Sequence, residues 1–414
     1  MQISGVISLP GDKSISHRAL MLASLASGEC VIHNISTGDD VESTRKCLAD
    51  CGIKSKKYGN TVKIKGGDIE TPQMPLNCGN SGTTVRLLSG LLSGKGVSVK
   101  FTGDQSLSKR PMKRIIEPLN KMGVSIESED GYLPMSLTPK NVNGIYYSTP
   151  ISSAQVKSCI ILAGLGAYSE TRVKEKIKSR DHTELMLKDL GAEIIAEDVI
   201  TVQPLKKPLD VFEITVPGDP SSAAFFAAAA AMIPNSDLTI KNVLANTTRI
   251  GFFTILEKMG AGVEWKNMSK EGGELVGDVN IISQPLNGLD IMEDLIPTVI
   301  DEIPIIAVLA TQADSPTVVR GAAELRVKES DRIKGICRNL RSMGAEIIEK
   351  QDGFIINPVT KLHHTKIQTF GDHRIAMAFT IAGLLSSENN ILDDEICINI
   401  SFPEFSDILR QISQ

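Results

Sequence analysis

The chain has 414 residues, of which 42% are hydrophobic and 4% aromatic, and its formal net charge at pH 7 is −5. This length predicts two ordinary domains with substantial cores. The small acidic excess and the few aromatic residues argue against a nucleic-acid partner, which would select basic surfaces and stacking side chains. No apolar run reaches the length of a membrane span, so no membrane partner is expected.

Cysteine use and the N-terminus indicate the compartment. The seven cysteines are scattered, odd in number and without paired metal-ligand spacing. They therefore predict neither a disulfide framework nor a metal site. The first residues run straight into a strand pattern without a targeting signal. We expect a cytoplasmic protein.

The first chemical motif follows directly on the first predicted strand. Residues 8–18 join this strand to an apolar helix through a Pro-Gly turn, and they carry Lys13, Ser14 and Arg18. Free N–H groups at a helix start, together with two cations, suit a phosphate or a carboxylate. A capped helix with a solvated basic start fits this segment equally well, so both readings remain open at this point.

One pattern then recurs along the chain: a helical run, a glycine and a β-rich run. The glycines are Gly52, Gly123, Gly191, Gly260 and Gly344. Each stands where a helix C-cap takes a left-handed residue. A period of about 70 residues implies an array of similar α/β units. The closing helix at 405–412 is a sixth, degenerate copy, and the copies group as three and three.

A Pro/Gly-rich break at 216–222 separates the third and fourth copies. We expect the chain to pass between the two halves near 216–220. The first strand can pair with either half, and pairing with the second half would add a crossing at 10–14. One lobe would then comprise residues 1–13 and 219–414, and the other residues 14–218. A cleft between two such lobes suits a small ligand.

Polar turns in both halves carry the remaining candidates. In the first half they are the glycine-rich turn 77–86, the arginine-bearing turn 102–114 and the segments 151–157 and 179–184. In the second half, Asp301 and Glu302 stand between apolar runs, where a carboxylate can act as a base or cap a helix. The run 325–333 places Lys328 and Arg332 at i, i+4 on a predicted helical face, beside Glu329. The turn 370–374 is a further anion seat. Such repeated cationic turns in an acidic chain favour an enzyme acting on small anionic substrates.

These motifs resemble one enzyme family. They are Leu9-Pro-Gly-Asp-Lys-Ser-Ile-Ser-His-Arg-Ala19, Gly79-Asn-Ser-Gly-Thr-Thr-Val-Arg86, Lys109-Arg-Pro111, Ser153-Ala-Gln155, Arg326-Val-Lys-Glu-Ser-Asp-Arg332 and Gly371-Asp-His-Arg374. The family is that of the enolpyruvylshikimate-phosphate synthases, and the match spans almost the whole chain. The resemblance implies a two-lobed, inside-out α/β barrel-like fold of six βαβαββ repeats, three per lobe. It also implies transfer of the enolpyruvyl group of phosphoenolpyruvate to the 5-hydroxyl of shikimate 3-phosphate by addition and elimination, without a metal or organic cofactor.

The resemblance also assigns the site residues. For shikimate 3-phosphate they are Lys13, Ser14, Arg18, Ser153, Gln155, Ser179, Asp301 and Lys328. For phosphoenolpyruvate they are Lys13, Gly82, Arg110, Gln155, Arg332 and Arg374. Asp301 would take the proton of the 5-hydroxyl, and Glu329 with Lys328 would deliver a proton to the methylene carbon. We expect a monomer.

The sequence departs from the family pattern in one place and leaves alternatives. Many members carry a lysine two residues before the Phe-Pro of the closing segment, where this chain has Ile400. Residues 153–157, 180–184 and 246–249 resemble the glyphosate-tolerant branch, whereas Gly82 leaves the response to this inhibitor open. The competing functions are enolpyruvyl transfer to the nucleotide sugar UDP-N-acetylglucosamine and non-catalytic anion binding by a repeat protein.

Overall fold

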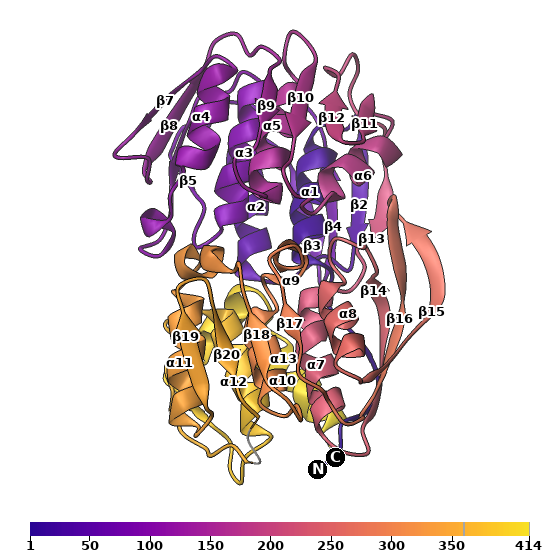
Figure 1. Cartoon of the computed structure of the whole chain (residues 1–414). Helices are drawn as coiled ribbons and strands as arrows, with labels where there is room; N and C mark the ends of the chain where they lie inside the picture. The colour runs from indigo at the N-terminus through magenta and orange to yellow at the C-terminus, as the bar shows by residue number, and fades with distance from the viewer. Residues whose placement is uncertain (359–360, 414) are drawn as a thin grey trace. The chain divides into compact units, whose positions relative to one another are not determined.

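The computed structural model describes residues 1–358 and 361–413, which fold as two compact units (Figure 1). Unit 1 comprises Met1–Pro10, Pro217–Ser269 and Leu275–Gln414. Unit 2 comprises Gly11–Val216 and the short stretch Lys270–Glu274. Each unit is built from repeats of one sheet topology.

Unit 2 contains three four-stranded sheets. Its helices are α1 (Lys13–Ser24), α2 (Asp39–Asp50), α3 (Gly82–Gly94), η1 (Leu107–Lys109), α4 (Lys113–Lys121), α5 (Ala154–Gly164) and α6 (His182–Asp189). Its strands are β2 (Glu29–His33), β3 (Ser55–Tyr58), β4 (Thr61–Lys65), β5 (Leu76–Asn77), β6 (Val99–Thr102), β7 (Val124–Ser128), β8 (Met135–Pro139), β9 (Tyr146–Ser148), β10 (Thr171–Lys174), β11 (Ile194–Ala196), β12 (Val199–Val202) and β13 (Glu213–Thr215).

The three sheets of unit 2 share one order of strands. They run β13–β2–β4–β3, β5–β6–β8–β7 and β9–β10–β12–β11. In each, the first pair is parallel and the other two pairs are antiparallel. The parallel pair needs a helical crossover and the last pair only a short turn, which is the βαβαββ pattern. The recurring topology confirms the repeat predicted from the glycine spacing.

Unit 1 contains the other helices and strands. Its helices are α7 (Pro220–Met232), α8 (Gly251–Lys258), α9 (Ile296–Val299), α10 (Ile303–Ala310), η2 (Ala323–Val327), α11 (Arg332–Ser342), α12 (His373–Gly383), η3 (Ile396–Ile400) and α13 (Phe405–Ile412). Its strands are β1 (Ser4–Ser8), β14 (Asp237–Leu244), β15 (Gly262–Glu271), β16 (Glu274–Ile282), β17 (Asp290–Ile291), β18 (Thr317–Val319), β19 (Ile347–Lys350), β20 (Gly353–Ile356), β21 (Lys366–Ile367) and β22 (Ile391–Leu392).

Two sheets of unit 1 repeat the same order, β1–β14–β16–β15 and β17–β18–β20–β19. The first strand of the chain, β1, pairs in parallel with β14, which answers the question of its partner. The third sheet consists of β21 and β22 alone, in parallel. Among the described residues this sixth repeat therefore lacks the antiparallel hairpin that six full βαβαββ copies would require. The sixth repeat is thus a degenerate, two-stranded copy beside five four-stranded ones.

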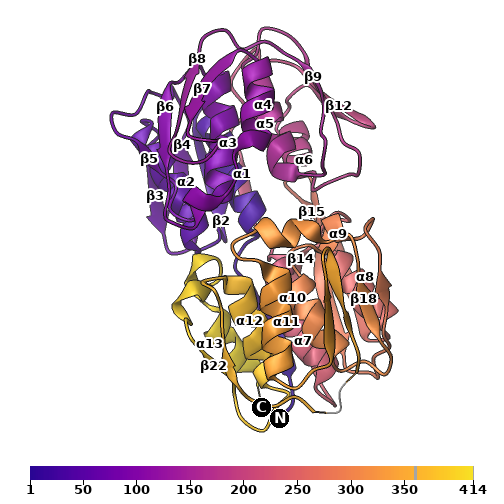
Figure 2. The same cartoon turned by 60° about the vertical axis from the view of Figure 1, so that its left-hand side comes forward.

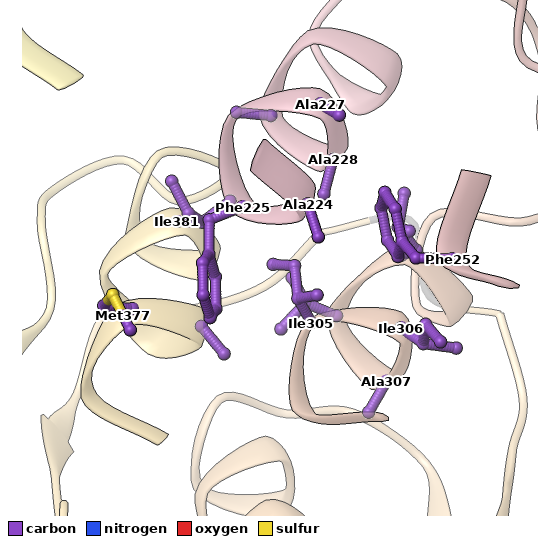
Figure 3. Close-up of a cluster of buried hydrophobic side chains, with 14 of the residues drawn as sticks. Ala224, Phe225, Ala227, Ala228, Phe252, Ile305, Ile306, Ala307, Met377 and Ile381 are labelled. Carbon is purple, nitrogen blue, oxygen red and sulfur yellow. The ribbon is translucent and has the colours of Figure 1, made fainter. Parts of the chain in front are cut away.

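Three helices within the core of unit 1, α7, α10 and α12, lie side by side (Figure 2). The alanines of α7 allow the neighbouring helices to approach it closely. Phe225 of α7 lies beside Met377 and Ile381 of α12, and Ala224 faces Ile305 of α10 (Figure 3). Residues on all sides of α7 are buried, as expected for a helix that is apolar around its whole circumference. The predicted site residues Asp301 and Arg374 lie at the N-terminal ends of α10 and α12.

The repeated glycines end their helices as predicted. All five have positive φ, at 88°, 97°, 78°, 103° and 88° in chain order. Each glycine stands directly after the helix C-cap, a position that residues with a Cβ rarely occupy with positive φ. No helix in the described part of the chain is long and apolar enough to cross a membrane.

Candidate active site

The predicted opening motif is a strand, a turn and a helix start. Asp12 caps α1, accepting a hydrogen bond of 2.7 Å from the backbone N–H of Ile15. Lys13, the first residue of the helix, places its ammonium 2.9 Å from Oδ2 of Asp40 on α2. Cap and ion pair together fix the direction of the Lys13 side chain.

Arg18, one turn further on, is 3% exposed and donates to neutral oxygens. Its Nε lies 2.7 Å from the hydroxyl of Thr183, one terminal nitrogen 2.8 Å from that of Ser158, and the other 2.9 Å from the carbonyl of Ser14. Burial lowers the pKa of Arg18 to about 10, with Glu184 opposing this effect. The guanidinium is thus held rigidly by hydrogen-bond partners that are all neutral.

The first turns of α3 and α5 are tied together. Arg86 donates a 2.5 Å hydrogen bond to the amide oxygen of Gln155, and the Gln155 nitrogen donates to Thr83 at 3.0 Å. A Cβ at Gly82 would lie 2.9 Å from a terminal nitrogen of Arg86 and 3.4 Å from one of Arg110. Glycine therefore leaves room for both guanidinium groups beside the start of α3.

Arg110 reaches this turn from the loop after β6. It is 7% exposed and donates to the Asn80 side chain at 2.6 Å and to Ser106 at 3.3 Å. Asn80 in turn donates to Asp104 at 2.7 Å. The Asn80 amide thus links Arg110 to Asp104.

Two predicted serines lie near α5. Ser153 is its N-cap, and its carbonyl accepts the backbone N–H of Lys157 at 3.0 Å. Ser179 lies in the loop before α6, where its hydroxyl donates to Glu175 and its carbonyl lies 3.4 Å from the Lys157 ammonium. The structure thus links both serines to the same buried lysine.

In unit 1 the predicted residues cluster around Arg332, which is 1% exposed. Its nitrogens lie 2.8 Å from Asp372, 2.7 Å from Glu329 and 3.4 Å from Asp301. Burial alone would lower the pKa of Arg332, but Asp372, Glu329 and Asp301 outweigh burial and raise it. One guanidinium thus joins three carboxylates from separate segments.

Arg374, on α12, shares Asp301 with Arg332 and also pairs with Glu302. Its terminal nitrogens lie 3.7 Å from the Asp301 carboxylate, 3.1 Å from the Asp301 carbonyl and 3.9 Å from Glu302. Asp372 caps α12 by accepting from the Arg374 backbone N–H at 2.9 Å. Burial would raise the pKa of Asp372, but Arg332 outweighs it, and the pKa is lowered. Asp301 lies between α9 and α10 with a side chain that is 16% exposed.

One sequence-based placement is wrong. Lys328 and Arg332 do not share a helical face, because η2 ends at Val327 and α11 begins only at Arg332. Lys328 is extended, with φ −79° and ψ −150°, and Glu329 follows it in the connecting turn. Asp331 caps α11 by accepting from Lys334, which stops the helix from extending back over Glu329.

Three functional candidates were missed in the sequence: Arg86, Asp40 and Asp372. Arg86 stands four residues after Gly82 on one helix, a spacing that places both on the same face. Asp40 and Asp372 give no such local signal, because each pairs with a cation distant in sequence. Helical spacing therefore pointed to Arg86 alone.

Ile400, which replaces the family lysine, packs against the hydrophobic core of unit 1. An apolar side chain offers no contact to a carboxylate or phosphate. Within residues 1–358 and 361–413, no group of three or more His, Cys, Asp or Glu side chains is arranged to hold a metal ion. All seven cysteines are buried free thiols.

Comparison with known proteins identifies the family. Residues 1–409 match the family described as EPSP synthase (3-phosphoshikimate 1-carboxyvinyltransferase). Two relatives named 3-phosphoshikimate 1-carboxyvinyltransferase, from Petrotoga mobilis and Oceanobacillus iheyensis, are 46% and 43% identical to this chain. Each alignment covers 99% of this chain and 97% of the relative. A solved EPSP synthase from Acinetobacter baumannii is 39% identical, with a TM-score of 0.89 over 100% of this chain and 96% of that one.

These matches place the chain among the enzymes that transfer an enolpyruvyl group. It belongs to the EPSP synthase family. The chain is a transferase of the shikimate pathway that carries the enolpyruvyl group of phosphoenolpyruvate to shikimate 3-phosphate. The comparisons favour this activity over transfer to a nucleotide sugar and over non-catalytic anion binding.

Proposed function

We propose that the residues of unit 2 bind shikimate 3-phosphate through its phosphate and ring hydroxyls. Ser14, Arg18, Ser153, Gln155 and Ser179 would hold this substrate. Their hydroxyl, amide and guanidinium groups suit a polyhydroxylated ring that carries one phosphate. The rigid support of Arg18 by Thr183 and Ser158 favours this role, because a preorganised donor loses little entropy on binding. Asp301 and Lys328 would complete this set.

Phosphoenolpyruvate would be bound by Lys13, Gly82, Arg110, Arg332 and Arg374, together with Gln155. Two anionic groups, a carboxylate and a phosphate, call for several cations, and arginine binds each in a bidentate manner. Lys13 would contact both substrates. Its ammonium stands at the first residue of α1, pairs with Asp40 and can donate up to three hydrogen bonds.

The reaction would proceed by addition and elimination. The 5-hydroxyl oxygen attacks C2 of phosphoenolpyruvate, Asp301 takes the hydroxyl proton, and Glu329 with Lys328 delivers a proton to the methylene carbon. The resulting tetrahedral adduct then loses phosphate from C2 and a proton from the new methyl group. Positive side chains stabilise the charge that develops on the leaving phosphate.

The contacts of Arg332 set a condition for this mechanism. In the substrate-free chain it already donates to Glu329 and Asp372 and pairs with Asp301. Phosphoenolpyruvate would therefore have to replace one of these carboxylates. Asp372 is fully buried and caps α12, so Glu329 and Asp301 are the partners to exchange. Substrate binding would thus displace Glu329 or Asp301 from Arg332.

This joining of Arg332 to both proton-transfer carboxylates is the observation that carries the proposal. The test is Glu329→Gln, assayed for phosphate release and for substrate binding by calorimetry. We expect turnover to fall by about 10² to 10⁴-fold, with the affinity for shikimate 3-phosphate kept. The control is Glu346→Gln on the exposed strand connection of the same unit. Equal loss of binding and turnover would contradict proton transfer by Glu329.

The remaining expectations concern the whole protein. We propose that it acts as a cytoplasmic monomer, since the scattered free cysteines suit a reducing compartment. The response to glyphosate remains a prediction, drawn from sequence resemblance to the tolerant branch. Sedimentation would test the monomer, and inhibition of phosphate release would test tolerance.

A further inference from the structure

A buried charged cluster lies one turn inside α5 and has no part in the roles proposed above. Lys157 is fully buried, with its ammonium 2.7 Å from Glu175 and 2.8 Å from Glu184. The two carboxylate side chains are 6% and 1% exposed. Burial raises the pKa of Glu184, and Lys157 opposes this effect.

Fold stability alone does not account for this cluster. Moving three charges out of water is costly, and well-packed apolar residues at such positions stabilise a fold as well or better. The Coulomb attraction within the cluster offsets only part of this cost. A role in holding another group would explain why these particular residues are buried together.

Ser179 is the group that the cluster holds. Its hydroxyl donates to Oε1 of Glu175, its backbone N–H donates to Oε2 at 3.3 Å, and its carbonyl lies 3.4 Å from the Lys157 ammonium. All three polar groups of Ser179 therefore meet Glu175 or Lys157. The described loop from Glu175 to Asp181 contains neither helix nor strand. These contacts consequently fix the serine where regular structure does not.

We propose that Glu175, itself fixed by Lys157, is a positioning residue that sets Ser179 for recognition of the substrate phosphate. The inference rests on the proposed binding of shikimate 3-phosphate at Ser179. A serine hydroxyl has one proton, and here Glu175 accepts it. A phosphate dianion can compete with a carboxylate for this proton, whereas a neutral ring hydroxyl competes poorly.

Glu175 therefore makes the contact selective for a phosphorylated ring. Lys157 has two functions in this arrangement. It holds Glu175 in place, and it reduces the repulsion between that carboxylate and an incoming phosphate. The substrate class that the device favours is a phosphorylated polyhydroxy acid over its unphosphorylated parent.

The test compares Glu175→Gln with the unaltered protein, titrating shikimate 3-phosphate and shikimate separately by calorimetry. We expect about tenfold weaker binding of shikimate 3-phosphate, because Ser179 loses the Glu175 contacts that position it and with them its charge-assisted hydrogen bond to the phosphate, and less than about a twofold change for shikimate. Glu175→Asp retains the charge for Lys157 but withdraws it from Ser179, so it must show the same selective loss. Glu117→Gln, which removes an exposed carboxylate paired with Lys121, is the control.

A double-mutant cycle separates positioning from general damage to the fold. If Glu175 acts through Ser179, adding Glu175→Gln to Ser179→Ala weakens binding no further. Additive losses, equal weakening of both ligands, or unchanged binding in Glu175→Gln and Glu175→Asp would overturn the inference while leaving the proposed function intact. Failure of the unaltered protein to bind shikimate 3-phosphate would instead contradict the proposed function itself.

Discussion

Arg18 in unit 2 and Arg332 in unit 1 are equally buried but have opposite surroundings. Arg18 is 3% exposed and donates to two hydroxyls and a carbonyl, and burial lowers its pKa to about 10. Arg332 is 1% exposed, and although burial acts in the same direction, three carboxylates raise its pKa. Burial alone therefore does not decide what a buried arginine does.

The difference separates two kinds of anion site. A guanidinium supported by neutral oxygens keeps its charge available and binds an anion without losing a partner. A guanidinium held by carboxylates must exchange one of them when a substrate anion arrives. We interpret Arg18 as a fixed binding group, and Arg332 as a group that exchanges one carboxylate for the substrate anion.

The largest effect should come from Arg332→Lys. An ammonium cannot reproduce a planar donor set that meets three carboxylates, so kcat/KM for phosphoenolpyruvate should fall by about 10³-fold. The measurement is steady-state phosphate release. Arg338→Lys, on an exposed position of the same helix, should remain within about twofold of the unaltered protein. Near-normal turnover in Arg332→Lys would abolish the distinction between the two arginines.

Arg18→Lys should have the next largest effect, and on binding. Lysine lacks the fork that joins Thr183 to Ser158, so the affinity for shikimate 3-phosphate should fall by about 10 to 100-fold. Arg172→Lys, at an exposed site of unit 2, is the matched control. A fall in kcat with unchanged affinity would assign Arg18 to the chemical step instead.

Gly82→Ala should produce a smaller change confined to phosphoenolpyruvate. The added Cβ would lie 2.9 Å from Arg86, whose flexible side chain can move at modest cost. We expect KM for phosphoenolpyruvate to rise by about 3 to 10-fold, with affinity for shikimate 3-phosphate unchanged. Gly67→Ala, where no atom lies within 4 Å of the new Cβ, serves as the control. Weaker binding of both substrates would show that Gly82 supports the fold of unit 2 rather than one ligand.

His17, next to Arg18, gives the smallest effect, on stability rather than activity. Burial lowers its pKa from 6.5 to about 3. The charge of Asp40 opposes this shift, whereas the charges of Lys13 and Arg18 add to it. Between these pH values the unfolded chain binds a proton that the folded chain does not. Stability is therefore lost as pH falls from about 6.5 towards 3, by up to about 1.4 kcal/mol per pH unit.

His17→Asn should flatten this dependence, measured as the thermal midpoint between pH 6.5 and 4. His364→Asn changes an exposed histidine and should leave the slope unaltered. If the thermal midpoint of His17→Asn kept the same dependence on pH, buried carboxylates rather than His17 would cause the loss of stability in acid.

Much of the fold could be predicted because its signals are local. Each of these signals sets the backbone within a few residues. They are the glycines that follow the helix C-caps, the Pro-Gly turn before α1 and the Gly-Asp turn before α12. The partner of β1 could not be chosen, since a short alternating strand fits either half equally. The turn at Lys328 was predicted to be helical because charged residues at i and i+4 are typical of a helical face. In the structure, the N-cap Asp331 makes α11 begin only at Arg332. Asp40 was missed because a carboxylate that pairs with a distant cation leaves no local pattern. The Gly-Asp turn marked the position of Asp372 but not its pairing with Arg332.

The most direct test is to titrate shikimate 3-phosphate into Arg18→Lys and Arg332→Lys side by side, without phosphoenolpyruvate. The different surroundings of the two arginines predict that only Arg18→Lys loses affinity, by about 10 to 100-fold, while Arg332→Lys binds as the unaltered protein does. Equal loss of affinity in both variants would contradict the separation of a fixed binding arginine from an exchanging one.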